Sequence, residues 1–185
     1  MYGLSAQSYG DEILSFLLAR LRNPSDAREV FSMFAEDLWT GLAGFGWRCS
    51  VRTWLYTLAR NATARYLVGS HKKGERNLSL GQLESQAALE DRLRSATDVY
   101  RQTAVKDRFR LLREQLDEED QTLLILRVDR GLSFRELAIA MSGDAELDEQ
   151  SLSKEAARHR KAFERVKLEL REAAEREGLL KRGDG

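Results

Sequence analysis

The chain contains one proline, Pro24, in 185 residues, although proline averages about 5% of the residues in proteins. Proline disrupts helix interiors, because it lacks a backbone N–H and clashes with the preceding turn. Its near absence leaves long stretches rich in leucine, alanine, arginine and glutamate, which are good helix formers. No stretch alternates apolar and polar residues as a half-buried strand does. The sequence therefore predicts an all-α fold.

The first 70 residues have the periodicity of three amphipathic helices. The first is expected over about residues 13–21. Asn23, Pro24 and Asp26 then suit the N-cap and first turn of a second helix that runs to about residue 45. After a short loop, Ser50 can cap the third helix. The apolar positions of the three helices are Ile13, Leu14, Leu17, Leu21, Ala27, Val30, Phe31, Phe34, Leu38, Leu42, Phe45, Trp54, Leu55, Leu58, Ala62 and Tyr66.

The periodicity weakens between about residues 69 and 104, where glycine, serine and asparagine replace large apolar residues. We interpret residues 71–104 as a linker with one loose helix around 83–99. The chain is thus predicted to form two small helical domains, over residues 1–70 and 105–185.

The second domain has the pattern of a helix-turn-helix. A short helix is expected near residues 109–116, and Asp117 is placed to cap the next one. Gly131 then suits the position after a helix end, and Ser133 and Glu136 form a capping box for another helix. Two helices joined by a glycine turn form the first part of a helix-turn-helix motif. A polar, acidic stretch at 142–151 separates them from a last helix predicted over about 152–179.

The last helix carries a basic stripe at helical spacing, formed by Lys154, Arg158, Lys161 and Arg165. Residues 154–167 hold six basic and two acidic residues, whereas residues 142–153 hold four acids and no base. Such a stripe fits a helix that docks on DNA, and it equally fits a solvated helix face. The charges alone do not choose between the two.

Several functional classes are excluded or disfavoured by the residues present. One cysteine and two histidines give no disulfide framework and no plausible metal site. Catalytic and phosphate-binding motifs are absent from the sequence, so we expect no enzyme and no cofactor. No run of 18 apolar residues and no secretory signal is visible, so we expect a cytoplasmic protein.

Two segments resemble RNA polymerase sigma factors. Residues 26–30, Trp39, Phe45 and the run 51–61 (VRTWLYTLARN) resemble region 2 of the sigma-70 family. Residues 116–121 and 124–138 resemble its region 4. The likeness covers about 130 of 185 residues and fits the small extracytoplasmic-function (ECF) subgroup best. The resemblance implies a transcription initiation factor that binds core polymerase and directs it to the −10 and −35 elements of promoters.

The resemblance also implies three sets of contact residues. Recognition of the −10 strand needs aromatic side chains on which unpaired bases stack, polar groups that bind the edge of a flipped base, and cations that bind phosphates. The residues expected there are Phe45, Trp47, Arg48, Ser50, Arg52, Thr53, Trp54, Tyr56, Arg60 and Asn61, although Trp54 equally suits the core. The −35 duplex is expected to contact Lys154, Arg158, Arg160 and Lys161. The β′ coiled coil of polymerase is expected to contact Arg28, Glu29, Ser32, Glu36 and Asp37.

By the same resemblance, the expected partners are core polymerase (β′ coiled coil and β flap), promoter DNA and an anti-sigma protein, with the free chain monomeric. Two other functions remain open on the sequence. One is a free-standing helix-turn-helix regulator that binds duplex DNA as a dimer, and the other is a sigma-like decoy or interaction module. The run 52–61 and the two-domain pattern favour a sigma factor over the regulator. Ser32-Met33, where the family usually has Gln-Glu, keeps the decoy open.

Overall fold

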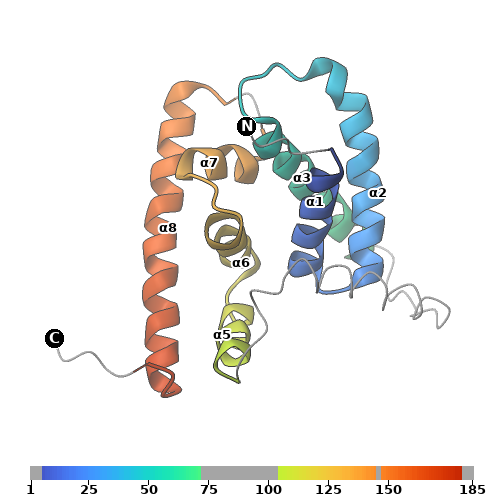
Figure 1. Ribbon diagram of the computed structural model, residues 1–185. Helices are drawn as coiled ribbons and strands as arrows, with labels where there is room; N and C mark the ends of the chain where they lie inside the picture. Colours follow the sequence, from blue (N-terminus) through green and yellow to red (C-terminus); the bar gives the residue numbers. More distant parts are fainter. Residues whose placement is uncertain (1–5, 72–103, 145–146, 181–185) are drawn as a thin grey trace.

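The computed structural model describes residues 6–71, 104–144 and 147–180. Within these ranges every regular element is helical, as Figure 1 shows, so the prediction of an all-α fold is confirmed. The predicted linker lies almost wholly outside the described residues, and the loose helix expected around 83–99 lies outside them entirely.

The first helical unit contains α1 (Ala6–Leu21), α2 (Pro24–Gly41), the short 3-10 turn η1 (Leu42–Gly44) and α3 (Val51–His71). Asn23 caps α2 as predicted, because its side chain accepts hydrogen bonds from the backbone N–H groups of Ser25 and Asp26. Ser50 caps α3 in the same way, with its Oγ accepting from the N–H of Thr53 at 3.1 Å. These caps fix where the two helices begin.

The end of α2 differs from the prediction, since the helix stops at Gly41 and η1 tightens the chain before Phe45. A Cβ at Gly41 would lie 3.2 Å from the indole ring of Trp54. The glycine therefore allows α2 and α3 to approach closely at this point, and the chain leaves the helix there.

The second helical unit contains α5 (Ala104–Glu114), α6 (Glu118–Leu124), the π-helical turn η3 (Ile125–Asp129), α7 (Phe134–Ser142) and α8 (Glu149–Arg176). The predicted caps are confirmed: Asp117 accepts from the N–H of Asp120 at 2.8 Å, and Ser133 and Glu136 form a full capping box. Gly131 has φ +70°, as a glycine after a helix end requires.

The last helix begins three residues earlier than predicted. Asp148 is its N-cap and accepts from the N–H of Ser151 at 3.0 Å, and Glu149 lies in the first turn. Acidic side chains are stabilised at the positive end of a helix, so residues that the composition assigned to a turn belong to the cap and first turn. The connection from α7 to α8 is therefore shorter than the predicted ten residues.

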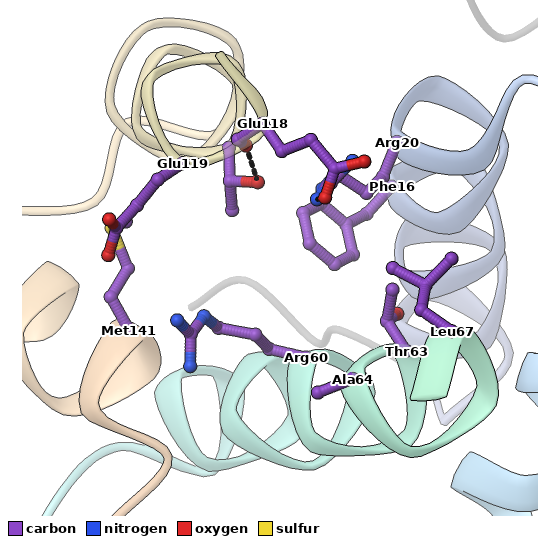
Figure 2. Close-up of a pocket in the computed structure, with 10 residues that line it drawn as sticks. Phe16, Arg20, Arg60, Thr63, Ala64, Leu67, Glu118, Glu119 and Met141 are labelled. Atoms are coloured by element: carbon purple, nitrogen blue, oxygen red, sulfur yellow. Dashed lines mark hydrogen bonds and ion pairs between the residues drawn. The ribbon is translucent and has the colours of Figure 1, made fainter. Parts of the chain in front are cut away.

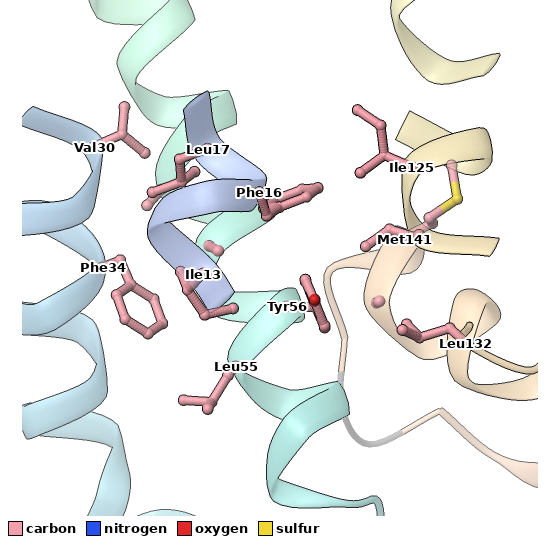
Figure 3. Close-up of a cluster of buried hydrophobic side chains, with 14 of the residues drawn as sticks. Ile13, Phe16, Leu17, Val30, Phe34, Leu55, Tyr56, Ile125, Leu132 and Met141 are labelled. Atoms are coloured by element: carbon pink, nitrogen blue, oxygen red, sulfur yellow. The ribbon is translucent and has the colours of Figure 1, made fainter. Parts of the chain in front are cut away.

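The two helical units share one hydrophobic core. Side chains from α1 and α3, including Phe16 and Tyr56, lie in the same buried cluster as Leu132 and Met141 of the second unit (Figure 3). Phe16 and Tyr56 pack edge to face with ring centroids 5.3 Å apart. Helix α3 lies directly against α7. This packing sets the position of the predicted −10 residues, because most of them lie on α3.

Candidate nucleic-acid interface

Three aromatic rings form a stack where η1, the following loop and α3 meet. Trp54 is buried at the base, and Phe45 lies parallel to it with centroids 4.6 Å apart and an interplanar angle of 23°. Trp47 packs on Phe45 with the ring centroids 4.9 Å apart and the planes tilted by 51°, and it is 76% exposed. Trp54 is thus both a core residue and the base of the stack. An exposed ring supported from below is the surface on which an unpaired base can stack.

The backbone at Trp47 has φ +56°, a left-handed conformation that is rare for residues other than glycine. Such outliers concentrate at functional sites, where the surrounding structure maintains them. Arg48 and Ser50 follow on the same loop, and both are exposed. The loop therefore presents an aromatic ring and a cation to solvent, whereas the hydroxyl of Ser50 is engaged with Thr53 in the cap of α3.

The next predicted residues along α3 face inward. Arg52 donates through Nε and Nη2 to Oε1 of Glu12, and the hydroxyl of Tyr56 donates to the same oxygen at 2.7 Å. Burial alone raises the pKa of Glu12, but the hydrogen bonds from Arg52 and Tyr56 outweigh it and the pKa is lowered. Burial and the contact with Glu12 both raise the pKa of Tyr56. Thr53 and Tyr56 are each only 1% exposed, so neither presents its side chain to solvent in this arrangement.

Arg60 and Asn61 lie at the boundary with the second unit. Arg60 extends from α3 into a cavity of about 320 Å³, across from Glu119 and Met141 (Figure 2). Burial lowers the pKa of Arg60, and the charge of Glu119 partly offsets this. Asn61 donates from Nδ2 to the backbone carbonyl of Gly143 at 3.0 Å. Of the ten predicted −10 residues, those on the loop are accessible and those on α3 mostly contact protein.

The predicted −35 residues, Lys154, Arg158, Arg160 and Lys161, are all exposed on the N-terminal half of α8. Arg158 pairs with Glu155 within the helix, at 3.3 Å. The fourth member of the basic stripe, Arg165, is exposed as well, but its Nη2 donates to both carboxylate oxygens of the buried Asp120 at 2.8 Å. The charge of Arg165 is therefore already paired within the protein.

Beside this face, a groove between α7 and α8 contains Arg127 and Arg135, two arginines that were not among the predicted site residues. The guanidinium of Arg127 lies 4.7 Å above the ring of Phe134, and that of Arg160 lies 5.3 Å from the same ring. Arg135 joins the groove and pairs with Glu149, linking the two helices. The sequence offered one signal for Arg127 and Arg135: the two residues lie on either side of the glycine turn of the predicted helix-turn-helix.

The predicted polymerase-binding residues form the outward side of α2. Glu29, Ser32 and Glu36 are exposed, whereas Arg28 and Asp37 are half-buried. The carboxylate of Asp37 pairs with Arg65 of α3. Near the end of the same helix Trp39 is 83% exposed, and Leu42, the first residue of η1, is 57% exposed. This region therefore also offers apolar area for a partner.

No group of three or more residues suited to bind a metal occurs in the described part of the chain. Burial raises the pKa of the thiol of Cys49, which disfavours the reactive thiolate. Burial lowers the pKa of His159, which is 6% exposed on α8, and so favours its neutral form. None of the described helices is long and apolar enough to span a membrane.

Comparison with known proteins gives no matching family model. The RNA polymerase sigma factor YlaC of Bacillus subtilis (strain 168) is 27% identical over 135 residues, which cover 71% of this chain and 74% of the relative. The structure of the sigma factor RpoE in complex with the anti-sigma factor NepR from Bartonella quintana aligns with a TM-score of 0.47 and 14% identity, over 85% of this chain and 91% of that one. That structural likeness is too weak to support an argument. This chain is therefore similar in sequence to an RNA polymerase sigma factor, and it resembles the ECF subgroup of the sigma-70 family.

Proposed function

We propose that this chain is an alternative sigma factor. It binds core RNA polymerase through the outward side of α2 and directs the enzyme to promoters. The loop at 45–50 and α3 read the −10 strand, and the exposed basic face of α8 reads the −35 duplex. Its partners are then core polymerase, promoter DNA and an anti-sigma protein, and the chain itself has no catalytic role.

One observation supports this function most directly: a single chain carries two surfaces with different nucleic-acid chemistry. The stack topped by Trp47 suits unpaired bases, which bind by stacking in a sequence-tolerant way. The four exposed cations of α8 suit the phosphates and guanine edges of a duplex. A factor that melts DNA at one element and binds duplex at another needs both surfaces.

The charge balance favours a factor that works only with polymerase. The chain has 30 basic and 30 acidic residues, so its formal net charge is zero. Non-specific DNA affinity comes mainly from cations that displace counterions from phosphates. A neutral chain therefore binds free duplex weakly and depends on polymerase for further contacts. A free-standing regulator needs more affinity of its own.

We expect the chain alone to form no stable complex with promoter duplex at about 150 mM salt, and a stable one once core polymerase is added. Mobility-shift titrations with and without core polymerase measure this difference. A stable shift by the chain alone, as a dimer, would support the helix-turn-helix regulator instead. Tight polymerase binding with no promoter preference would support the decoy.

A further inference from the structure

The cavity into which Arg60 extends has the size and lining of a small-molecule site. Its volume is about 320 Å³, and α1, α3, α6 and the end of α7 contribute to its walls. Ligand pockets in proteins cover roughly 300–1,000 Å³, so this one has room for a small metabolite. We propose that it binds a free α-amino acid with an apolar side chain. This inference goes beyond the proposed function and does not depend on it.

One part of the cavity wall is apolar. Phe16 of α1 and Met141 of α7 line it and are 1% and 5% exposed, and Leu67 of α3 lines it beside them. The hydroxyls of Thr63 and Thr122, which also line the cavity, donate to backbone carbonyls of their own helices at 2.8 and 2.7 Å. Their protons are therefore already engaged, and this part of the wall favours an apolar side chain.

Four charged side chains also line the cavity, and two of them satisfy each other. Arg20 donates to Glu118 at 2.9 Å. Arg60 and Glu119 lie across the cavity from each other (Figure 2) and form no hydrogen bond or ion pair within the described part of the chain. A half-buried guanidinium without a partner is unfavourable, because it has lost water without gaining a hydrogen bond. The cavity thus holds one cation and one anion that a ligand can satisfy.

A zwitterion complements these two charges. A carboxylate on the ligand accepts hydrogen bonds from the guanidinium of Arg60, and an ammonium group donates to the carboxylate of Glu119. An α-amino acid carries both groups on one carbon, and its side chain is the third point of contact, against the apolar wall. The lining has two arginines and two glutamates, so it is neutral overall and disfavours polyanions such as nucleotides.

Isothermal titration calorimetry on the full chain tests the ligand chemistry. The probes are L-leucine, L-methionine and L-phenylalanine, which we expect to bind. Three relatives of L-leucine each lack one feature: L-leucinamide has no carboxylate, N-acetyl-L-leucine has no ammonium group, and L-serine has no apolar side chain. Each is expected to bind at least about tenfold more weakly, since each loses a charged hydrogen bond or the apolar contact.

Substitutions in the cavity test its location. Arg60→Gln and Glu119→Gln each remove one charge, and Ala64→Phe places a ring in the cavity from an exposed position on α3. All three should weaken L-leucine binding at least about tenfold. Arg65→Gln and Glu164→Gln make the same charge changes outside the cavity lining and should leave the affinity unchanged. Circular dichroism should show the same helix content in all five variants.

No binding of any of the three amino acids would overturn this proposal. Equal affinity in the cavity variants and their controls, or equal affinity for L-leucine, its amide and its N-acetyl form, would also overturn it. Amino-acid binding at this cavity together with no transcription in the presence of core polymerase would instead overturn the proposed function and leave the amino-acid site standing.

Discussion

Trp47→Ala is expected to weaken binding of the −10 strand by the polymerase complex about 5- to 150-fold, because one base–aromatic stack contributes roughly 1–3 kcal/mol. The residue is 76% exposed, so its loss leaves the core intact. The measurement is the dissociation constant of the complex for fork-junction promoter DNA whose −10 strand is unpaired. Permanganate footprinting should show a matching loss of promoter melting.

Leu168→Ala is the control for this substitution. Leu168 is also an exposed apolar residue, at 58%, but it lies on α8, outside the aromatic stack and outside the predicted DNA and polymerase contacts. Its replacement should leave the affinity for fork-junction DNA unchanged. Equal losses in both variants, or no loss at Trp47, would place the −10 strand somewhere other than the 45–50 loop.

Arg158→Ala with Lys161→Ala should lower the salt dependence of −35 binding. Both side chains are exposed on α8, and each phosphate contact contributes about 0.9 to the slope of log affinity against log salt. We expect the slope of the polymerase complex on promoter duplex to fall by about 1–2, with at least a tenfold loss of affinity at low salt.

Lys167→Ala with Arg171→Ala removes the same charge from the same helix. Those side chains pair with Glu164 at 2.7 Å and with Glu175 at 3.0 Å, further from the N-terminal half of α8. Their loss should leave the slope nearly unchanged. A lower slope in this variant and an unchanged one at Arg158 and Lys161 would move the duplex-binding face toward the C-terminal half of α8.

Local signals predicted the fold well because they depend on neighbouring residues. Asn23, Asp117 and the Ser133–Glu136 box cap the helices they were expected to cap. The start of α8 was missed because an acidic composition looks like a turn, whereas Asp148 acts as a cap. The end of α2 was missed because the apolar pattern continues through Leu42 to Phe45, whereas the helix ends at Gly41 and a 3-10 turn follows.

The site was predictable as a set of residue types but not as a surface. The motif run 51–61 supported the resemblance to sigma factors, which the relative from Bacillus subtilis confirms. Periodicity cannot show that Asn61 meets Gly143, because the two are 82 positions apart. Arg127 and Arg135 were missed for a similar reason, since the groove around Phe134 exists only when α7 and α8 pack together. The assignments of individual residues to −10, −35 and polymerase contacts remain predictions.

The central claim is that this chain gives core polymerase a promoter specificity. Run-off transcription with purified bacterial core polymerase on pooled genomic promoter fragments, with and without the chain, tests it most directly. The account predicts discrete new transcripts whose start sites share sequence motifs near −10 and −35. Stable core binding without new transcripts, or neither binding nor transcripts, would contradict it.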